Sequence, residues 1–240
     1  MIGVYHIVDL NVRIESRYPD VHKVCEKFAT TDPYDVSLRI SPEDSMFQKK
    51  FRPGVVVDGK IWGLDTEGYK ESRAFCRAFA GLMPERNAFL FHGSAIAVDG
   101  EAYVFAAKSG TGKSTHTALW RKLLGDRAVM INDDKPILKV TDQETRAYGT
   151  PWCGKHRLGN NVDAPVKAIC ILERGEENSI EEISRAEAMP ILMQQAHRPV
   201  DPGATLKTLQ LVRAMNVKFF RLKCNMDISA AELAYNTMRG

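Results

Sequence analysis

Residues 107–115 read A-K-S-G-T-G-K-S-T, and this stretch decides which kind of fold the chain adopts. It fits the phosphate-loop pattern G-x-x-x-x-G-K-[ST], with alanine in place of the first glycine. In such a loop the glycines let backbone N–H groups turn toward an anion, the lysine brings a positive charge to the terminal phosphates, and the serine hydroxyl binds Mg²⁺. The residues predicted to surround the phosphates are Ala107, Lys108, Ser109, Gly110, Thr111, Gly112, Lys113, Ser114 and Thr115.

The segments on both sides of this loop match what a phosphate site requires. Residues 101–107, E-A-Y-V-F-A-A, form an apolar run that ends at the loop and predicts a strand. Residues 114–124 predict a helix, with Gly125 as its C-terminal cap. The positive end of the helix dipole would then point at the anion. This context disfavours the alternative, a chance Gly/Ser turn ahead of a helix.

A second turn signal relates the loop to an earlier histidine. Asp99 and Gly100 form a two-residue hairpin turn between the apolar run 88–98 and the strand that feeds the loop. Extending that register without a bulge places His92 opposite Ala107, beside the phosphates. The alternative is a histidine whose hydrogen bonds are satisfied inside the core. We favour the interpretation that His92 is a site residue.

A pair of carboxylates follows the next apolar run. Residues 128–131 predict a buried strand, and it ends in Asn132, Asp133 and Asp134. One carboxylate can hold Mg²⁺, and the other can take the proton from an attacking hydroxyl. A polar turn is the alternative. The pair ends the next strand after the loop, and this position favours the functional interpretation.

A long connection is predicted over residues 141–168, and it contains a compact basic cluster, Lys155, His156 and Arg157. Long glycine-containing loops are often lids or binding loops. Lys155 and Arg157 could clamp a transferring phosphoryl group or an anionic substrate. A solvated turn explains the same residues equally well, so both interpretations stay open.

The bulk composition indicates an ordinary globular protein. The chain has 240 residues, of which 44% are hydrophobic and 26% charged, and its net charge of +3 does not indicate a nucleic-acid or membrane partner. Its five scattered cysteines suggest free thiols, so we expect a soluble cytoplasmic protein. The oligomeric state stays open, a homo-oligomer included.

The remaining patterns suggest two regions. Residues 1–85 predict a small N-terminal α+β region, with a strand over 4–14, helices over 19–29 and 69–83, and a hairpin at Asp58-Gly59. Residues 86–240 predict a second, larger region, the core that contains the phosphate loop. In that core 166–172 predicts a strand, and capping boxes begin at Ser184 and Ser229.

Together, the stretches F-H-G-S-A-I-A-V-D-G, A-K-S-G-T-G-K-S-T and N-D-D resemble the catalytic domain of HPr kinase/phosphorylase. That domain shares its nucleotide site with ATP-dependent phosphoenolpyruvate carboxykinase. The resemblance covers roughly residues 88–140 and implies an α/β fold, a mixed-sheet sandwich that contains a phosphate loop. It also implies active-site roles for His92 and Lys113, Mg²⁺ binding by Ser114 with support from Asp133, and a catalytic base at Asp134.

Residues and resemblance together predict an ATP- and Mg²⁺-dependent phosphotransferase. Its acceptor would be a hydroxyl-bearing substrate: a small alcohol, a peptide serine or a protein serine. The N-terminal region does not resemble the regulatory domain of HPr kinase, so HPr itself is not implied as the acceptor. Two alternatives remain: a regulatory module that binds a nucleotide without turnover, and an ATPase coupled to motion.

Overall fold

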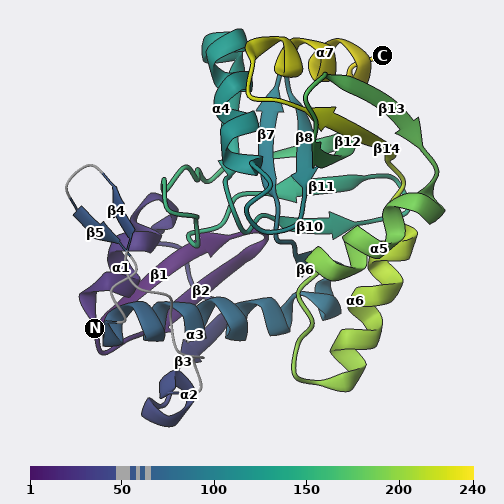
Figure 1. Cartoon of the computed structure of the whole chain (residues 1–240). Coiled ribbons are helices and arrows are strands. Elements are labelled where there is room, and N and C mark those ends of the chain that lie inside the picture. Colours follow the sequence, from purple (N-terminus) through teal and green to yellow (C-terminus); the bar gives the residue numbers. More distant parts are fainter. Residues whose placement is uncertain (47–54, 58–59, 63–65) are drawn as a thin grey trace. The chain divides into compact units, whose positions relative to one another are not determined.

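The computed structural model describes residues 1–46, 55–57, 60–62 and 66–240 (Figure 1). They divide into two compact units, Met1–Leu82 and Met83–Gly240, and each is described by itself. Of the described residues, none forms a helix that is both long and apolar enough to cross a membrane.

The first unit is built on a three-stranded sheet in the order β1-β2-β3. β1 (Ile2–Ile7) pairs antiparallel with β2 (Leu10–Glu15), and β2 pairs parallel with β3 (Val36–Arg39). The single strand predicted over residues 4–14 is therefore wrong. Val8 takes a φ of 61° and turns the chain, which a run of alternating apolar residues does not reveal.

Helices complete the first unit. They are α1 (Pro19–Cys25), the 3-10 turn η1 (Glu26–Phe28), α2 (Pro42–Met46) and α3 (Glu67–Leu82). β4 (Val55–Val57) pairs antiparallel with β5 (Lys60–Trp62). The predicted helices at 19–29 and 69–83 are confirmed within a few residues. The Asp58-Gly59 turn lies outside the described residues. Glu71 on α3 is fully buried and accepts a 2.9 Å hydrogen bond from Arg17 Nε.

The second unit, all of whose residues the structure describes, is a mixed α/β fold around a curled mixed sheet of nine strands. The main strand order is β6-β10-β11-β12-β8-β7-β9, and β14 and β13 branch from β12. The strands are β6 (Ala88–Leu90), β7 (Ser94–Val98), β8 (Glu101–Ala106), β9 (Ala128–Asn132), β10 (Ile137–Val140), β11 (Thr145–Tyr148), β12 (Asp163–Arg174), β13 (Ser179–Ile183) and β14 (Lys218–Cys224). The helical elements are η2 (Pro84–Arg86), α4 (Lys113–Leu124), η3 (Gly125–Arg127), α5 (Arg185–Gln195), α6 (Pro202–Ala214) and α7 (Ile228–Met238).

The curl of the sheet follows from β12, which changes partner along its length. Its first residues pair antiparallel with β11, and from Ala168 onward it pairs parallel with β14, while β8 runs parallel along its other side. The predicted strand over 166–172 is thus the middle of a longer one. β11 lies inside the segment predicted as a loop connection, 141–168. Its four residues, T-R-A-Y, were too short and too mixed to be recognised as a strand.

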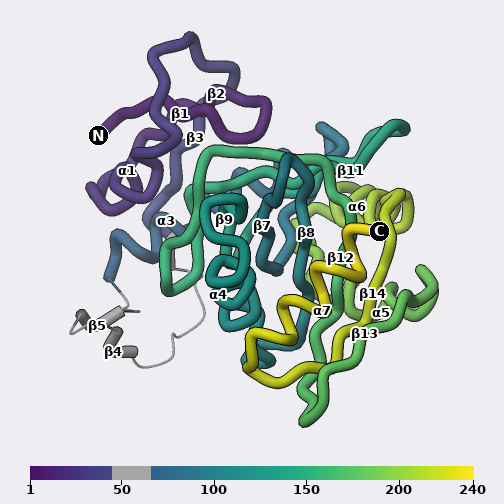
Figure 2. Tube along the Cα trace, turned by 90° about the horizontal axis from the view of Figure 1, so that it is seen from above, coloured from purple at the N-terminus to yellow at the C-terminus, as the bar shows by residue number. Residues whose placement is uncertain are grey.

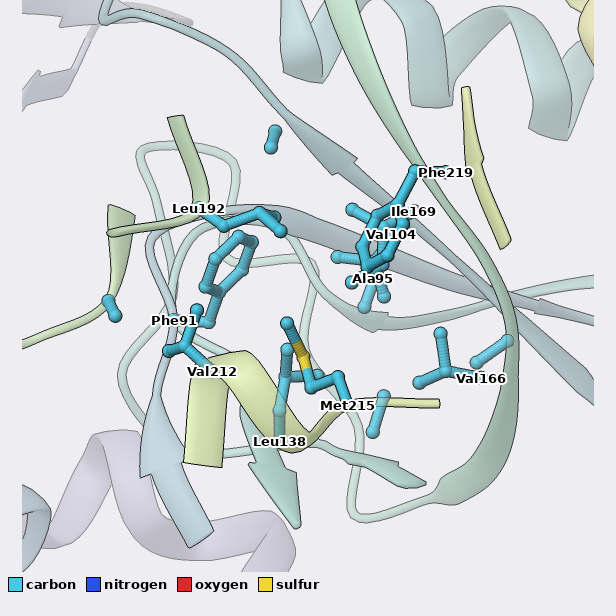
Figure 3. Packing of buried hydrophobic residues seen from close by; sticks show 14 of the residues in the cluster. Phe91, Ala95, Val104, Leu138, Val166, Ile169, Leu192, Val212, Met215 and Phe219 are labelled. Carbon is cyan, nitrogen blue, oxygen red and sulfur yellow. The ribbon is translucent and has the colours of Figure 1, made fainter. Parts of the chain in front are cut away.

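Helices cover both faces of the sheet (Figures 1 and 2). On β8, Tyr103 and Phe105 face the cluster that contains Trp120 of α4 and Tyr235 of α7. Val104, between them, faces the opposite cluster, to which α5 and α6 contribute Leu192 and Val212 (Figure 3). The alternation of a strand between two apolar faces therefore explains the three layers.

One of the two predicted capping boxes forms. The Ser184 side chain accepts from the backbone N–H of Glu187, and the Glu187 carboxylate accepts from the backbone N–H of Ser184. The box predicted at Ser229 is wrong, because α7 begins two residues earlier than predicted, with Asp227 as its N-cap. Ser229 Oγ instead accepts a 3.0 Å hydrogen bond from Asn178 Nδ2.

Candidate active site

Strand direction brings three loops to one edge of the sheet. β7 is antiparallel to both β8 and β9, so β8 and β9 run in the same direction, and β12 is parallel to β8. The chain leaves all three strands on the same side. In open α/β sheets, ligands bind outside the carboxyl ends of such strands.

The loop after β8 contains two glycines in the left-handed region of backbone conformation. Gly110 and Gly112 have φ values of 82° and 118°, and a Cβ at either position would meet nothing within 4 Å. The space next to these glycines is therefore open. Ala107, at the first position of the pattern, is buried in the core and does not belong to the residues with positive φ. α4 begins directly after Gly112, at Lys113.

Lys113, the first residue of α4, is half-buried. Its Nζ donates to the carbonyl oxygen of Ala107 at 3.2 Å. Burial lowers the pKa of Lys113, and the negative charge of Asp134 acts in the opposite direction. The loop lysine and the second aspartate are thus close enough to interact electrostatically.

Asp134 is the partner of two basic side chains. His92 Nε2 lies 3.2 Å from its Oδ1, and Lys135 Nζ bonds to its Oδ2. Burial alone would raise the pKa of Asp134. The hydrogen bond from His92 and the positive charge of Lys135 outweigh that effect and hold the pKa well below its usual value. The carboxylate is ionised at neutral pH, and each of its oxygens can accept a further hydrogen bond.

Asp133 has a different environment. It is 4% exposed, and its Oδ1 accepts a 2.7 Å hydrogen bond from the backbone N–H of Gly154. Its Oδ2 is buried without a hydrogen-bond partner among the described residues. Burial raises the pKa of Asp133, and the charge of Asp134 adds to that effect. An unpartnered buried carboxylate oxygen is costly unless a cation or donor meets it.

Asn132 connects residues 132–135 with the loop over 149–162, and we call the place where these two segments meet the corner. Asn132 is fully buried, and its Oδ1 accepts from the backbone N–H groups of Asp134 and Lys135 at 2.8 and 2.6 Å. Its Nδ2 donates to the carbonyl oxygen and to the Oγ1 of Thr150, at 3.0 and 3.1 Å. One side chain therefore links the aspartates to the loop over 149–162. The N-D-D motif contains Asn132, but the sequence alone does not indicate this linking role.

The hairpin register is confirmed, but its extension to His92 is wrong. Val98 pairs with Glu101, and the ladder continues to Ser94 and Phe105, where β7 begins. Beyond that point the chain leaves the ladder: the backbone N–H of His92 donates to the carbonyl oxygen of Gln195 at 2.8 Å. His92 therefore reaches the site through Asp134 and not by lying opposite Ala107.

The residue of this loop that contacts the aspartates is Gly154, next to the basic cluster. Lys155, His156 and Arg157 are exposed, and Arg157 has a φ of 52°. The contact with Asp133 comes from Gly154, just before them. A Cβ at Gly154 would lie 3.0 Å from Asp133 Oδ2, so glycine permits this close approach.

Arg174 is a basic residue at this edge that the sequence did not single out. It ends β12, and its Nη2 donates to the carbonyl oxygen of Gly110 at 2.7 Å. The signal was hidden because Arg174 is 64 residues from Gly110 along the chain. Only the parallel pairing of β8 with β12 brings it to the loop.

Comparison with known proteins identifies a family. Residues 78–230 match the model described as SynChlorMet cassette protein ScmC. The chain belongs to the ScmC family. No curated protein matches this ScmC-family chain. Among solved structures it is similar to the Hpr(Ser) kinase/phosphatase from Coxiella burnetii, at 12% identity and a TM-score of 0.37, over 63% of this chain and 99% of that one.

Proposed function

We propose that this ScmC-family chain is a kinase that transfers the γ-phosphoryl group of ATP to a hydroxyl. One observation carries the proposal: the glycine-rich loop with Lys113 follows β8, Asp134 follows β9, and these two strands end at the same edge of the sheet. The motif resemblance to HPr kinase/phosphorylase in residues 88–140 supports the same reaction class.

In this reaction the loop binds the phosphates of ATP. The acceptor oxygen attacks the γ-phosphorus, the bond from that phosphorus to the bridging oxygen breaks, and ADP leaves. The acceptor proton passes to Asp134. A weak base is sufficient, because the transition state of phosphoryl transfer is loose and places little charge on the attacking oxygen. Lys113 stabilises the charge on the phosphates, and Arg174 lies beside the loop, where it can do the same.

The residues at the corner fit a magnesium ion. The unpartnered, buried Oδ2 of Asp133 is the kind of oxygen that Mg²⁺ binds, and Ser114 offers a hydroxyl at the start of α4. The described residues contain no group of three or more His, Cys, Asp or Glu side chains that could hold a metal. Mg²⁺ would thus depend on Asp133, Ser114, the phosphates and water, and would supply charge neutralisation when bound.

Two measurements on the full chain test this function. The first is ATP binding by calorimetry with the Lys113→Ala variant, for which we expect a loss of affinity of at least about tenfold, because a charged hydrogen bond contributes about 1.5–3 kcal/mol. Lys122→Ala is the matched control, since Lys122 is exposed on the same helix. The second measurement is transfer of label from γ-labelled ATP to a library of hydroxyl compounds and serine peptides.

The alternative function, nucleotide binding without turnover, predicts a different pattern. ATP would bind and depend on Lys113, but label would reach no acceptor. Replacing Asp134 by Asn would then change neither binding nor any reaction. That combination of results would replace the kinase proposal with the regulatory module.

A further inference from the structure

A cavity of about 540 Å³ lies next to the candidate active site, within the second unit. Its lining includes His92 and Lys135, both of which contact the carboxylate of Asp134. The rest of the lining comes from the end of β6, the second half of α5 and the three residues that follow α5. Its volume falls in the range of small-molecule sites.

The ionisable groups that line the cavity are all basic. They are His92, Lys135, His197 and Arg198, and the described lining residues include no aspartate or glutamate. Concave sites lined by charge of one sign concentrate the field and attract ligands of the opposite sign. His92 and Lys135 are paired with Asp134, so the preference of the cavity for an anionic group comes from its His197 and Arg198 side.

The end of α5 does not cancel this preference. A helix C-terminus carries a partial negative charge on its free carbonyl groups, which would repel an anion. Here Arg198 Nη2 donates to the carbonyl oxygen of Met193 at 3.3 Å, within the last turn. The backbone N–H of His197 donates in turn to the carbonyl oxygen of Leu90 at 2.9 Å. These contacts hold the two basic residues against the cavity wall.

A second observation points to a hydrogen-bond donor on the ligand. Gln195 lines the cavity and is 5% exposed, yet its side-chain Oε1 has no hydrogen-bond partner in the described part of the chain. A buried acceptor of this kind costs free energy until a donor meets it. A hydroxyl group is such a donor, and Leu90 and Met193 offer an apolar wall for the carbon chain that carries it.

We propose that this cavity binds the phosphoryl acceptor, and that the acceptor is a small hydroxy acid, with its carboxylate toward Arg198 and His197 and a hydroxyl toward Gln195 and Asp134. This inference rests on the proposed kinase function and names its substrate class. The acceptor hydroxyl gives its proton to Asp134 and forms the new bond to the γ-phosphorus. The products are ADP and a phosphate ester that keeps its carboxylate.

Binding to matched pairs of compounds tests the inference on the full chain. The pairs are glycerate with glycerol, lactate with propylene glycol, and tartrate with threitol, each titrated by calorimetry and offered as acceptor with γ-labelled ATP. We expect at least one acid to bind about tenfold more tightly than its uncharged partner, and to be the labelled product. Arg198→Gln should lose about tenfold in that affinity, Arg198→Lys should retain most of it, and Lys122→Gln should lose none.

The Gln195 contact has its own test. In the native chain lactate should bind more tightly than propionate, which lacks the hydroxyl, and Gln195→Leu should abolish the difference while melting temperature reports that the variant folds. Equal binding of acids and uncharged partners, or full acid affinity in Arg198→Gln, would overturn the proposal. If acids bind through Arg198 but no label is transferred, the kinase function fails and the anion cavity stands. If only uncharged alcohols are labelled, the function stands and the cavity proposal fails.

Discussion

Two aspartates of the second unit are paired with basic residues but lie in different surroundings: Asp99 in the turn of the β7–β8 hairpin, and Asp134 after β9, near the open end of that hairpin. At the turn, Asp99 accepts a 3.0 Å hydrogen bond from Arg127 Nε and contacts Tyr235 Oη at 3.4 Å. Near the other end, Asp134 is held by His92 and Lys135. The hydrogen bond from Arg127 lowers the pKa of Asp99, so both carboxyl groups have lowered pKa values.

The difference lies in what remains unsatisfied nearby. Asp99 is exposed, and its partners bind it to the surface of the unit. Asp134 is half-buried next to an open glycine-rich loop, a cavity with a basic lining, and Asp133 with its buried, unpartnered oxygen. Asp99, a structural carboxylate, and Asp134, a candidate catalytic one, therefore share a lowered pKa and an ion pair. They are distinguished by the open space and the unpartnered hydrogen-bond acceptor next to Asp134.

The largest expected effect is the loss of transfer on replacing Asp134. Asp134→Asn should reduce the rate of phosphoryl transfer by about a hundredfold to ten-thousandfold, because an amide cannot accept the acceptor's proton. ATP affinity should stay within about twofold, since the phosphates bind the loop. Label transfer under single-turnover conditions and calorimetry measure the two quantities. A native rate would show that Asp134 takes no part in the chemistry, and Asp99 and Asp134 would then not differ in function.

The corner that positions Asp134 should depend strongly on Asn132. Asn132→Ala removes hydrogen bonds to two backbone N–H groups and to Thr150, and we expect a loss of about 3 kcal/mol in the free energy of unfolding. Urea denaturation followed by circular dichroism measures it. Asn178→Ala, in the turn between β12 and β13, is the matched control, with an expected loss below about 1 kcal/mol.

A buried histidine at the loop end should make stability depend on pH. His116 is 3% exposed, its ring packs at 4.8 Å against Phe105, and its Nε2 accepts from Trp120 Nε1 at 3.0 Å. Burial lowers the pKa of His116 to about 4. In the unfolded chain the pKa is about 6.5.

Protonation of His116 therefore favours the unfolded state. Its contribution to stability is unchanged above about pH 6.5 and falls by about 2–3 kcal/mol as the pH drops toward the folded pKa. His116→Gln, which keeps an acceptor for Trp120, should flatten that decline in urea titrations across the pH range. His156→Gln, at an exposed histidine, should leave the decline as it is. A decline that is equally steep in His116→Gln would show that other groups cause it.

The smallest effect is expected at the turn. Asp99→Asn removes the charge that pairs with exposed Arg127, so the melting temperature should fall slightly and phosphoryl transfer should stay native. Scanning calorimetry and the label-transfer assay check both. A loss of transfer comparable to that of Asp134→Asn would contradict the distinction between the two ends.

The parts of the site that the sequence predicted well are those built from local pattern. The loop glycines, the start of α4 and the Asp99-Gly100 turn depend on residues adjacent in the chain, and the structure places them as expected. Arg174 and Gln195 could not be predicted in this way. Their position depends on strand pairing and on helix packing between segments that are far apart in the sequence.

His92 shows where local extrapolation ends. The register from the turn is correct for five residue pairs, and then the backbone turns away toward Gln195. Nothing in the alternation of residues 88–98 marks that departure. Its consequence, a contact with Asp134 instead of Ala107, follows from tertiary packing.

Ala107 has a consequence for finding related chains. The loop pattern asks for glycine at its first position, but here that residue is buried in the core and the positive φ values fall on Gly110 and Gly112. A methyl group is compatible with that place, so the first position accepts alanine as well as glycine, while positive φ favours glycine at the two inner positions. A database search that weights the inner glycines and relaxes the first would recover homologues that a strict motif filter discards.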